Sequence, residues 1–219
     1  MSPSLSPLMI ADCAPLAAVA ASLIRLRQKQ ALTSLIVTSC NAGEGKTTVA
    51  LQIARAAVLE SELRVLLIDC NPANPRLADL LNCDPVPGFA DFLDGRVAED
   101  VIIRATAVRG LDLMPFGSPG PGRASRYEPG RLRSKLPWLS ATEGAAYDLI
   151  VLDGPSSVGE FDLTASASLF DGVVLVIECE RTRWEVVRNY QDRLRDGNAN
   201  LLGAVMNKRR YYIPKGLYV

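Results

Sequence analysis

The chain has 219 residues, of which 48% are hydrophobic, which is enough for one domain with a sizeable core and excludes an intrinsically disordered protein. Its 24 basic and 24 acidic side chains cancel, so no overall charge favours nucleic acid or an anionic membrane surface. The five cysteines are dispersed without a CxxC pair and histidine is absent, which argues against a structural zinc site and is typical of a reducing, cytoplasmic compartment.

Short runs of Val, Ile and Leu alternate along the chain with segments of helical spacing. Residues 1–13 are expected to form a flexible arm and residues 14–30 a helix. The expected strands are residues 35–37, 64–69, 111–115, 149–153, 172–178 and 201–206. The further expected helices are residues 46–59, 76–82, 89–94, 130–140 and 183–195. Glycine and proline punctuate a long expected loop at residues 117–130.

The apolar runs lack strict alternation, which indicates strands that are covered on both faces. Strands of that kind alternating with helices predict a doubly wound α/β fold with a mostly parallel sheet and right-handed crossovers. We expect one nucleotide-binding domain over residues 14–207, followed by a tail of residues 208–219. No stretch approaches the roughly 20 apolar residues of a membrane helix, and no signal peptide is recognised, so direct membrane insertion is not expected.

A glycine-containing segment joins the first expected strand to the next helix, which is the context of a phosphate-binding loop. Gly43 and Gly45 allow successive backbone amides to converge on one point, next to the positive end of the helix dipole. Lys46 adds a mobile charge for the β- and γ-phosphates, and Thr47 offers a hydroxyl to magnesium. The residues expected to contact nucleotide here are Asn41, Ala42, Gly43, Glu44, Gly45, Lys46, Thr47 and Thr48. Cys40 stands where the strict motif has its first glycine.

Two expected strands end in aspartate, at Asp69 and at Asp153. In parallel sheets, ligands bind outside the carboxyl ends of the strands, so both carboxylates are expected beside the phosphates. Magnesium takes oxygen ligands and retains several waters, which carboxylates can hold. We therefore predict ATP and Mg²⁺ as cofactors, with Thr47, Asp69 and Asp153 as the residues that bind the metal.

Together these segments resemble the bacterial tyrosine kinases, P-loop kinases of the MinD/ParA-like class that accompany polysaccharide co-polymerases in capsule and exopolysaccharide export. The resemblance is carried by residues 43–47, 65–69, 75–77, 87–95, 147–155 and 203–207. It implies ATP-dependent autophosphorylation on tyrosine and a contact between Asn207 and adenine. It also implies a Wzz-like membrane co-polymerase as activator, recruitment to the inner face of the plasma membrane, and a homo-oligomer.

Some positions depart from the family pattern. Asn71 stands where the family has a second aspartate, and an amide cannot act as a general base near neutral pH. The catalytic set implied by the resemblance is thus Lys46, Asp69, Asn71 and Asp153. The family's ring-assembly motif, Glu-x-x-Arg-x-x-Arg, retains only Arg27. Asn41 stands where partitioning ATPases place a signature lysine, which argues against that branch.

The tail contains Tyr211, Tyr212 and Tyr218, which are phosphoacceptor candidates because the family phosphorylates a terminal tyrosine cluster. A solvated basic-aromatic terminus is the alternative for this segment. Cys40 and Cys70 are expected near the nucleotide, either as small buried apolar residues or as redox-active thiols with a lowered pKa.

Three functions remain open at this stage. The first is a tyrosine autokinase that controls exopolysaccharide or capsular polysaccharide biosynthesis and export. The second is a catalytically impaired pseudokinase that acts as an ATP-dependent regulatory binding module. The third is a MinD/ParA-like ATPase.

Overall fold

A computed structural model describes residues 21–23, 25–27, 32–98, 101–118, 147–157 and 164–209. The strands are β1 (Ser34–Ser39), β2 (Val65–Asp69), β3 (Arg104–Ala105), β4 (Leu111–Met114), β5 (Leu149–Ser156), β6 (Gly172–Glu178) and β7 (Leu201–Asn207). The labelled helices are α2 (Lys46–Ser61), α3 (Leu77–Leu81), α4 (Phe89–Leu93), α6 (Thr164–Ala167) and α7 (Trp184–Asp196). Residues 21–23 and 25–27 are also helical.

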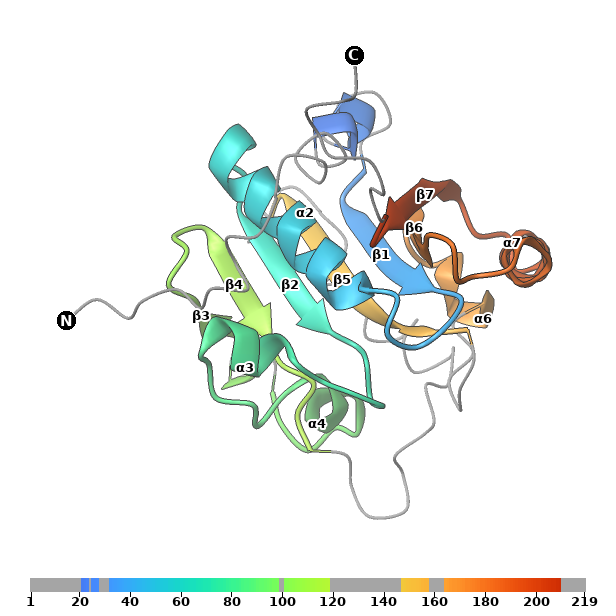
Figure 1. Ribbon diagram of the computed structural model, residues 1–219. Coiled ribbons are helices and arrows are strands. Elements are labelled where there is room, and N and C mark those ends of the chain that lie inside the picture. The colour runs from blue at the N-terminus through green and yellow to red at the C-terminus, as the bar shows by residue number, and fades with distance from the viewer. Residues whose placement is uncertain are drawn as a thin grey trace.

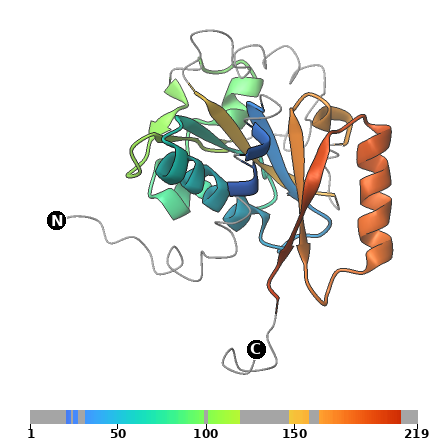
Figure 2. The ribbon, with the colours of Figure 1, turned by 90° about the horizontal axis from the view of Figure 1, so that it is seen from above.

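The strands form one sheet in the order β3-β4-β2-β5-β1-β6-β7, with β1 between β5 and β6 (Figure 1). All neighbouring strands pair in parallel except β3 and β4, which pair antiparallel at one edge. Helix α2 covers one face of the sheet, whereas α6 and α7 cover the other (Figure 2). The expected doubly wound, mostly parallel α/β fold is confirmed.

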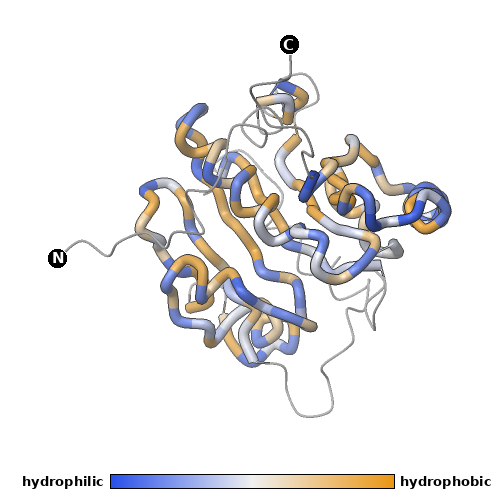
Figure 3. The backbone as a smooth tube through the Cα atoms, viewed as in Figure 1, coloured by the Kyte–Doolittle hydropathy of each residue, from blue (hydrophilic) through white to orange (hydrophobic). Residues whose placement is uncertain are grey.

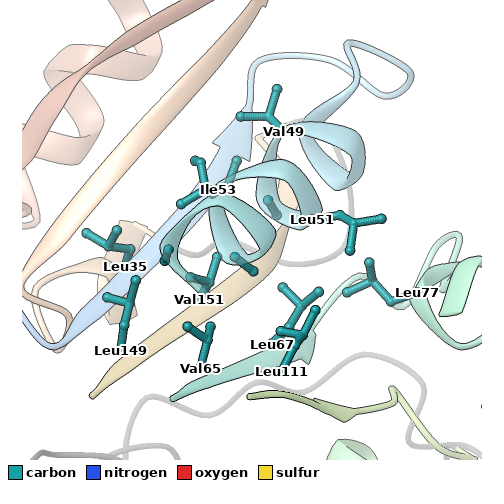
Figure 4. Packing of buried hydrophobic residues seen from close by; sticks show 14 of the residues in the cluster. Leu35, Val49, Leu51, Ile53, Val65, Leu67, Leu77, Leu111, Leu149 and Val151 are labelled. Carbon is teal, nitrogen blue, oxygen red and sulfur yellow. The ribbon is translucent and has the colours of Figure 1, made fainter. Parts of the chain in front are cut away.

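The central strands β1, β2, β5 and β6 are apolar along most of their length because each contributes to two cores, one on each face of the sheet (Figure 3). In β2, Val65 and Leu67 pack toward α2, whereas Leu66 and Ile68 pack toward the opposite layer with α7. Figure 4 shows the first of these cores, where residues of α2 such as Ile53 lie over the side chains of the central strands. This packing fixes the start of α2 against the end of β1, where the glycine-containing loop lies.

The structure extends or corrects several expected elements. Strand β5 continues to Ser156, three residues beyond its expected end at Asp153, and α2 continues to Ser61. The two-residue strand β3 and the four-residue helix α6 were not expected, because elements of this length have too few residues to show a period. Residues 1–20, 119–146 and 210–219 lie outside the described residues, and with them the arm, most of the long loop and the helix expected at residues 130–140.

The part of the chain that the structure describes contains no helix with the length and apolar character needed to cross a bilayer. Within the helix of residues 21–27, Arg27 donates from Nη2 and Nε to the backbone carbonyl of Asp148, at 2.9 and 3.3 Å. This contact ties the helix to the residue just before β5. The arginine retained from the ring-assembly motif is thus engaged within its own chain.

Candidate nucleotide site

A pocket of about 270 Å³ opens at the carboxyl edge of the sheet, above the ends of β1 and β2. Its walls come from the loop after β1, the first turn of α2 and the segment between β2 and α3. The lining residues are Ala42, Gly43, Gly45, Lys46, Thr47, Thr48, Asn71, Ala73, Asn74, Arg76, Leu80 and Ser156. Most residues expected at the phosphates therefore line one opening.

The loop between β1 and α2 takes its shape from two glycines in the left-handed region, Gly43 at φ 82° and Gly45 at φ 93°. At Gly45 the constraint is also steric, because a Cβ atom there would lie 2.2 Å from Nδ2 of Asn207. Helix α2 begins directly after this turn, at Lys46. The free amides of its first turn and the positive end of the helix dipole therefore face the opening, as an anion requires.

The carbonyl oxygens of the same loop accept hydrogen bonds from donors around it. These bonds are Ser157 Oγ to Cys40 O at 2.9 Å, Ser39 Oγ to Asn41 O at 2.8 Å, Lys208 Nζ to Gly43 O at 2.6 Å, and Asn207 Nδ2 to Glu44 O at 2.8 Å. Fixing the carbonyl dipoles in this way fixes the peptide planes of the loop. The end of β7 thus braces the phosphate-binding loop, a role for Lys208 that sequence reasoning missed.

Asp69 and Asp153, which we call the carboxylate pair, are register partners on neighbouring strands: Asp69 is the last residue of β2, whereas Asp153 lies within β5, three residues before its end. Asp69 is 1% exposed, and its carboxylate accepts three backbone N–H groups: those of Asn71 at 3.1 Å, Arg76 at 3.0 Å and Leu77 at 3.1 Å. Burial raises the pKa of Asp69 to about 6, although the amide donors and the nearby charge of Lys46 act in the opposite direction. Asp69 therefore holds the segment that leads into α3.

Asp153 is fully buried, and neither of its carboxylate oxygens has a hydrogen-bond partner among the described residues. Burial and the neighbouring charge of Asp69 raise the pKa of Asp153 to about 7, while the Thr47 hydroxyl and the Lys46 ammonium only partly offset this. A buried carboxylate with unused oxygens is costly unless a cation meets it. The donor set around it, all oxygen and with a threonine hydroxyl nearby, fits a hard cation such as Mg²⁺.

Asn71 lies at the rim of this arrangement and is 4% exposed. Its side-chain amide donates to the backbone carbonyl of Asn74 at 3.2 Å, so it holds the turn after β2. Asn41 is also engaged: its Nδ2 and its backbone N–H both donate to the carboxylate of Glu44, each at 3.0 Å. Both side-chain amides are therefore engaged in hydrogen bonds within the turns that they occupy.

Cys40 and Cys70 are both buried, at 0% and 1% exposure. Burial, together with the charge of Glu44, raises the pKa of Cys40 to about 12. Its thiol is therefore protonated at neutral pH, and of the two alternatives the small apolar residue is supported for Cys40. Tyr211, Tyr212 and Tyr218 lie outside the described residues.

Comparison with known proteins places this geometry in context. The sequence pattern of the CobQ/CobB/MinD/ParA nucleotide binding domain matches residues 35–211. The tyrosine-protein kinase YwqD of Bacillus subtilis (strain 168) is 28% identical over 180 residues, which cover 82% of this chain and 73% of YwqD. The succinoglycan biosynthesis transport protein ExoP of Rhizobium meliloti (strain 1021) is 27% identical over 176 residues, which cover 80% of this chain and 22% of ExoP.

Among solved structures, the kinase domain of VpsO superposes with a TM-score of 0.74 at 28% identity, and the match covers 90% of this chain and 94% of that domain. The resemblance to bacterial tyrosine kinases is therefore confirmed by similarity in both sequence and structure. The chain spans less than a quarter of ExoP, and it thus corresponds to one part of that longer protein.

Proposed function

This chain belongs to the CobQ/CobB/MinD/ParA nucleotide binding domain family, and we propose that it binds ATP with Mg²⁺ and acts as a tyrosine autokinase in exopolysaccharide or capsule assembly. The observation that carries this proposal is the convergence of Lys46, Thr47 and the carboxylate pair at one edge of the sheet. Phosphoryl transfer depends mainly on positioning and on stabilising charge, which is what such a set supplies.

Each of these groups has a distinct task in the proposed reaction. The amides of the loop and of the first turn of α2 hold the phosphate chain, with Asn41, Ala42, Gly43, Glu44, Gly45 and Thr48 forming the loop around it. Lys46 places its ammonium against the phosphate oxygens. Thr47, Asp69 and Asp153 would hold a magnesium ion, which would supply positive charge to offset that of the phosphates. Asn207 contacts adenine at the end of β7.

The biological setting rests on the relatives. YwqD is named a tyrosine-protein kinase and ExoP a biosynthesis transport protein for succinoglycan, a polysaccharide. By this similarity, the partner is a Wzz-like membrane co-polymerase that recruits the chain to the inner face of the plasma membrane and activates it. The phosphate acceptors are Tyr211, Tyr212 and Tyr218 of a neighbouring copy in a homo-oligomer. The nucleotide domain spans residues 14–207 and the acceptor tail residues 208–219.

The proposal is tested with the purified full chain, MgATP and the cytoplasmic segment of the co-polymerase. We expect tyrosine labelling that is lost in Lys46→Met and in a variant with phenylalanine at the three tail tyrosines. The control is Tyr147→Phe, because the Tyr147 hydroxyl donates to Asp112 at 2.8 Å, away from the pocket, and this variant keeps its label. Nucleotide binding without any label overturns the kinase activity, and phosphate release without label supports the MinD/ParA-like ATPase.

Asn71 favours a second candidate function. In this case the chain is a pseudokinase that binds ATP and regulates polysaccharide export through a conformation that depends on the bound nucleotide. The side-chain amide of Asn71 donates to the backbone carbonyl of Asn74, and an amide cannot act as the general base that the family aspartate would supply. A general base typically contributes 10²–10⁴ in rate, so Asn71→Asp is expected to raise turnover by at least about tenfold. If the wild type already turns over at the rate of the Asn71→Asp variant, this candidate is rejected.

A further inference from the structure

The carboxylate of Glu44 lies inside the loop that receives the phosphates, yet it is 1% exposed. Its Oε2 accepts the backbone N–H of Asn41, and its Oε1 accepts Nδ2 of the same residue, both at 3.0 Å. Oε1 also accepts a hydrogen bond from the hydroxyl of Thr182. A buried negative charge in a loop built for anions is unfavourable unless donors hold it in place.

Thr182 belongs to the segment between β6 and α7, more than a hundred residues along the chain from Glu44. Strand β6 pairs with β1, so this segment emerges beside the phosphate-binding loop. The backbone N–H of Thr182 donates to the carbonyl of Glu178 at 3.2 Å, which anchors the residue on the end of β6. Among the described residues, Thr182 is the donor to the Glu44 carboxylate that comes from outside the loop.

We propose that Thr182 is a positioning residue for the phosphate-binding loop and acts through the carboxylate of Glu44. The inference rests on the proposed nucleotide binding and adds the residue that sets the loop for it. Glu44 lies between Gly43 and Gly45, whose left-handed backbones allow the peptide planes around it to turn. Holding the Glu44 side chain therefore holds those planes, and with them the amides that meet the phosphates.

Without the Thr182 hydroxyl, Oε1 of Glu44 keeps only the Asn41 amide. The carboxylate is then free to turn toward the phosphate position, where it repels the nucleotide and misaligns the loop. Losing one hydrogen bond to a buried charged group predicts a rise in the dissociation constant for MgATP of about 10- to 30-fold in Thr182→Val. Thr182→Ser retains the hydroxyl and is expected to bind within about twofold of wild type.

The experiment is a double-mutant cycle on the full chain, with MgATP and MgADP affinities measured by calorimetry and the thermal midpoint measured without nucleotide. In the Glu44→Ala background, Thr182→Val is expected to change the dissociation constant by less than about twofold, because the carboxylate it acts through is gone. Thr106→Val is the matched control. It removes a hydroxyl that donates to the carbonyl of Leu111 at 2.7 Å in the β3–β4 hairpin, away from the phosphate-binding loop. This variant is therefore expected to lower the thermal midpoint and to leave the affinity for nucleotide unchanged.

Three outcomes overturn the inference while wild-type binding stands. They are an unchanged affinity in Thr182→Val, an equal loss in Thr182→Ser, and an equal loss of affinity with and without the Glu44 carboxylate. If the wild type binds no more nucleotide than the Lys46→Met variant does, both this inference and the proposed function are overturned. If Glu44→Ala does not fold, the contrast between the valine and serine variants at position 182 decides by itself.

Discussion

Asp69 and Asp153 lie side by side on the neighbouring strands β2 and β5, but their surroundings differ. At the end of β2, Asp69 accepts three backbone amides and organises the entry to α3. Within β5, Asp153 is equally buried and accepts no hydrogen bond from the described residues. A buried polar group that is satisfied stabilises the fold, whereas one that is not is held ready for a ligand at a cost in stability. Asp69 is thus bonded within its own chain, whereas the oxygens of Asp153 are available to the magnesium ion that we propose.

The largest expected effect is on the affinity for ATP in the presence of Mg²⁺. Asp153→Asn retains the shape of the side chain but removes the charge that a magnesium ion would meet. We expect the Mg²⁺-dependent part of ATP affinity to fall by about 100-fold, which corresponds to about 2.7 kcal/mol. Calorimetric titration with and without Mg²⁺ measures it, and an equal loss in the absence of the metal would assign Asp153 to folding instead.

Asp153→Asn is expected to weaken Mg²⁺-dependent binding but to raise the stability of the protein without ligand. The pKa of Asp153 is about 7 in the folded chain and near 3.8 when unfolded, so the folded state binds more protons between these values. Stability therefore falls as pH rises through this window, and wild type carries an uncompensated buried charge above it. Without nucleotide at pH 8, Asp153→Asn should be more stable by about 2 kcal/mol, measured by urea unfolding. A less stable variant contradicts this account.

Removing the other aspartate should destabilise the protein. Asp69→Ala deletes the acceptor for three amides before and within α3, and the loss of a helix-capping carboxylate costs about 1–2 kcal/mol. Because the charge of Asp69 contributes to the raised pKa of Asp153, this variant should also lower that pKa. Urea unfolding across pH gives both quantities. If Asp69→Ala and Asp153→Asn shift stability in the same direction at pH 8, the distinction between the two aspartates fails.

The smallest effect is the pH dependence of metal binding in wild type. Mg²⁺ needs the ionised form of Asp153, whose fraction rises from about 10% at pH 6 to about 50% at pH 7 for a pKa of about 7. We expect Mg²⁺-dependent ATP affinity to rise by about fivefold over this interval and to level off above pH 8. Asp153→Asn lacks this group, so its residual affinity should change less over the same range, with only the ionisation of Asp69, whose pKa is about 6, remaining.

The sequence was informative where a local pattern is sufficient. Uninterrupted apolar runs located the central strands, and Gly43, Gly45 and Lys46 located the loop, because in each case the cause lies within a few residues. The two aspartates were also visible in the sequence, and the parallel sheet brought them side by side as expected, although β5 continues to Ser156 rather than ending at Asp153. The two aspartates were indistinguishable in sequence, however, since amide donors to Asp69 depend on how the chain turns before α3.

What the sequence could not reveal comes from contacts between distant segments. Thr182 and Lys208 meet the loop only because β6 pairs with β1 and β7 pairs with β6, and neither residue belongs to a motif. The packing of α6 against α7 and the pairing of β3 with β4 likewise depend on tertiary contacts that override weak local preference. A signal for Thr182 would have been a buried acidic residue in the loop, which needs a donor from elsewhere.

The anchored position of Lys208 limits the reach of the chain beyond it. Its ammonium is fixed on Gly43 and Glu178, and its backbone adopts φ 56° at the end of β7. The chain that follows Lys208 therefore leaves the domain from a point that is held against the phosphate-binding loop.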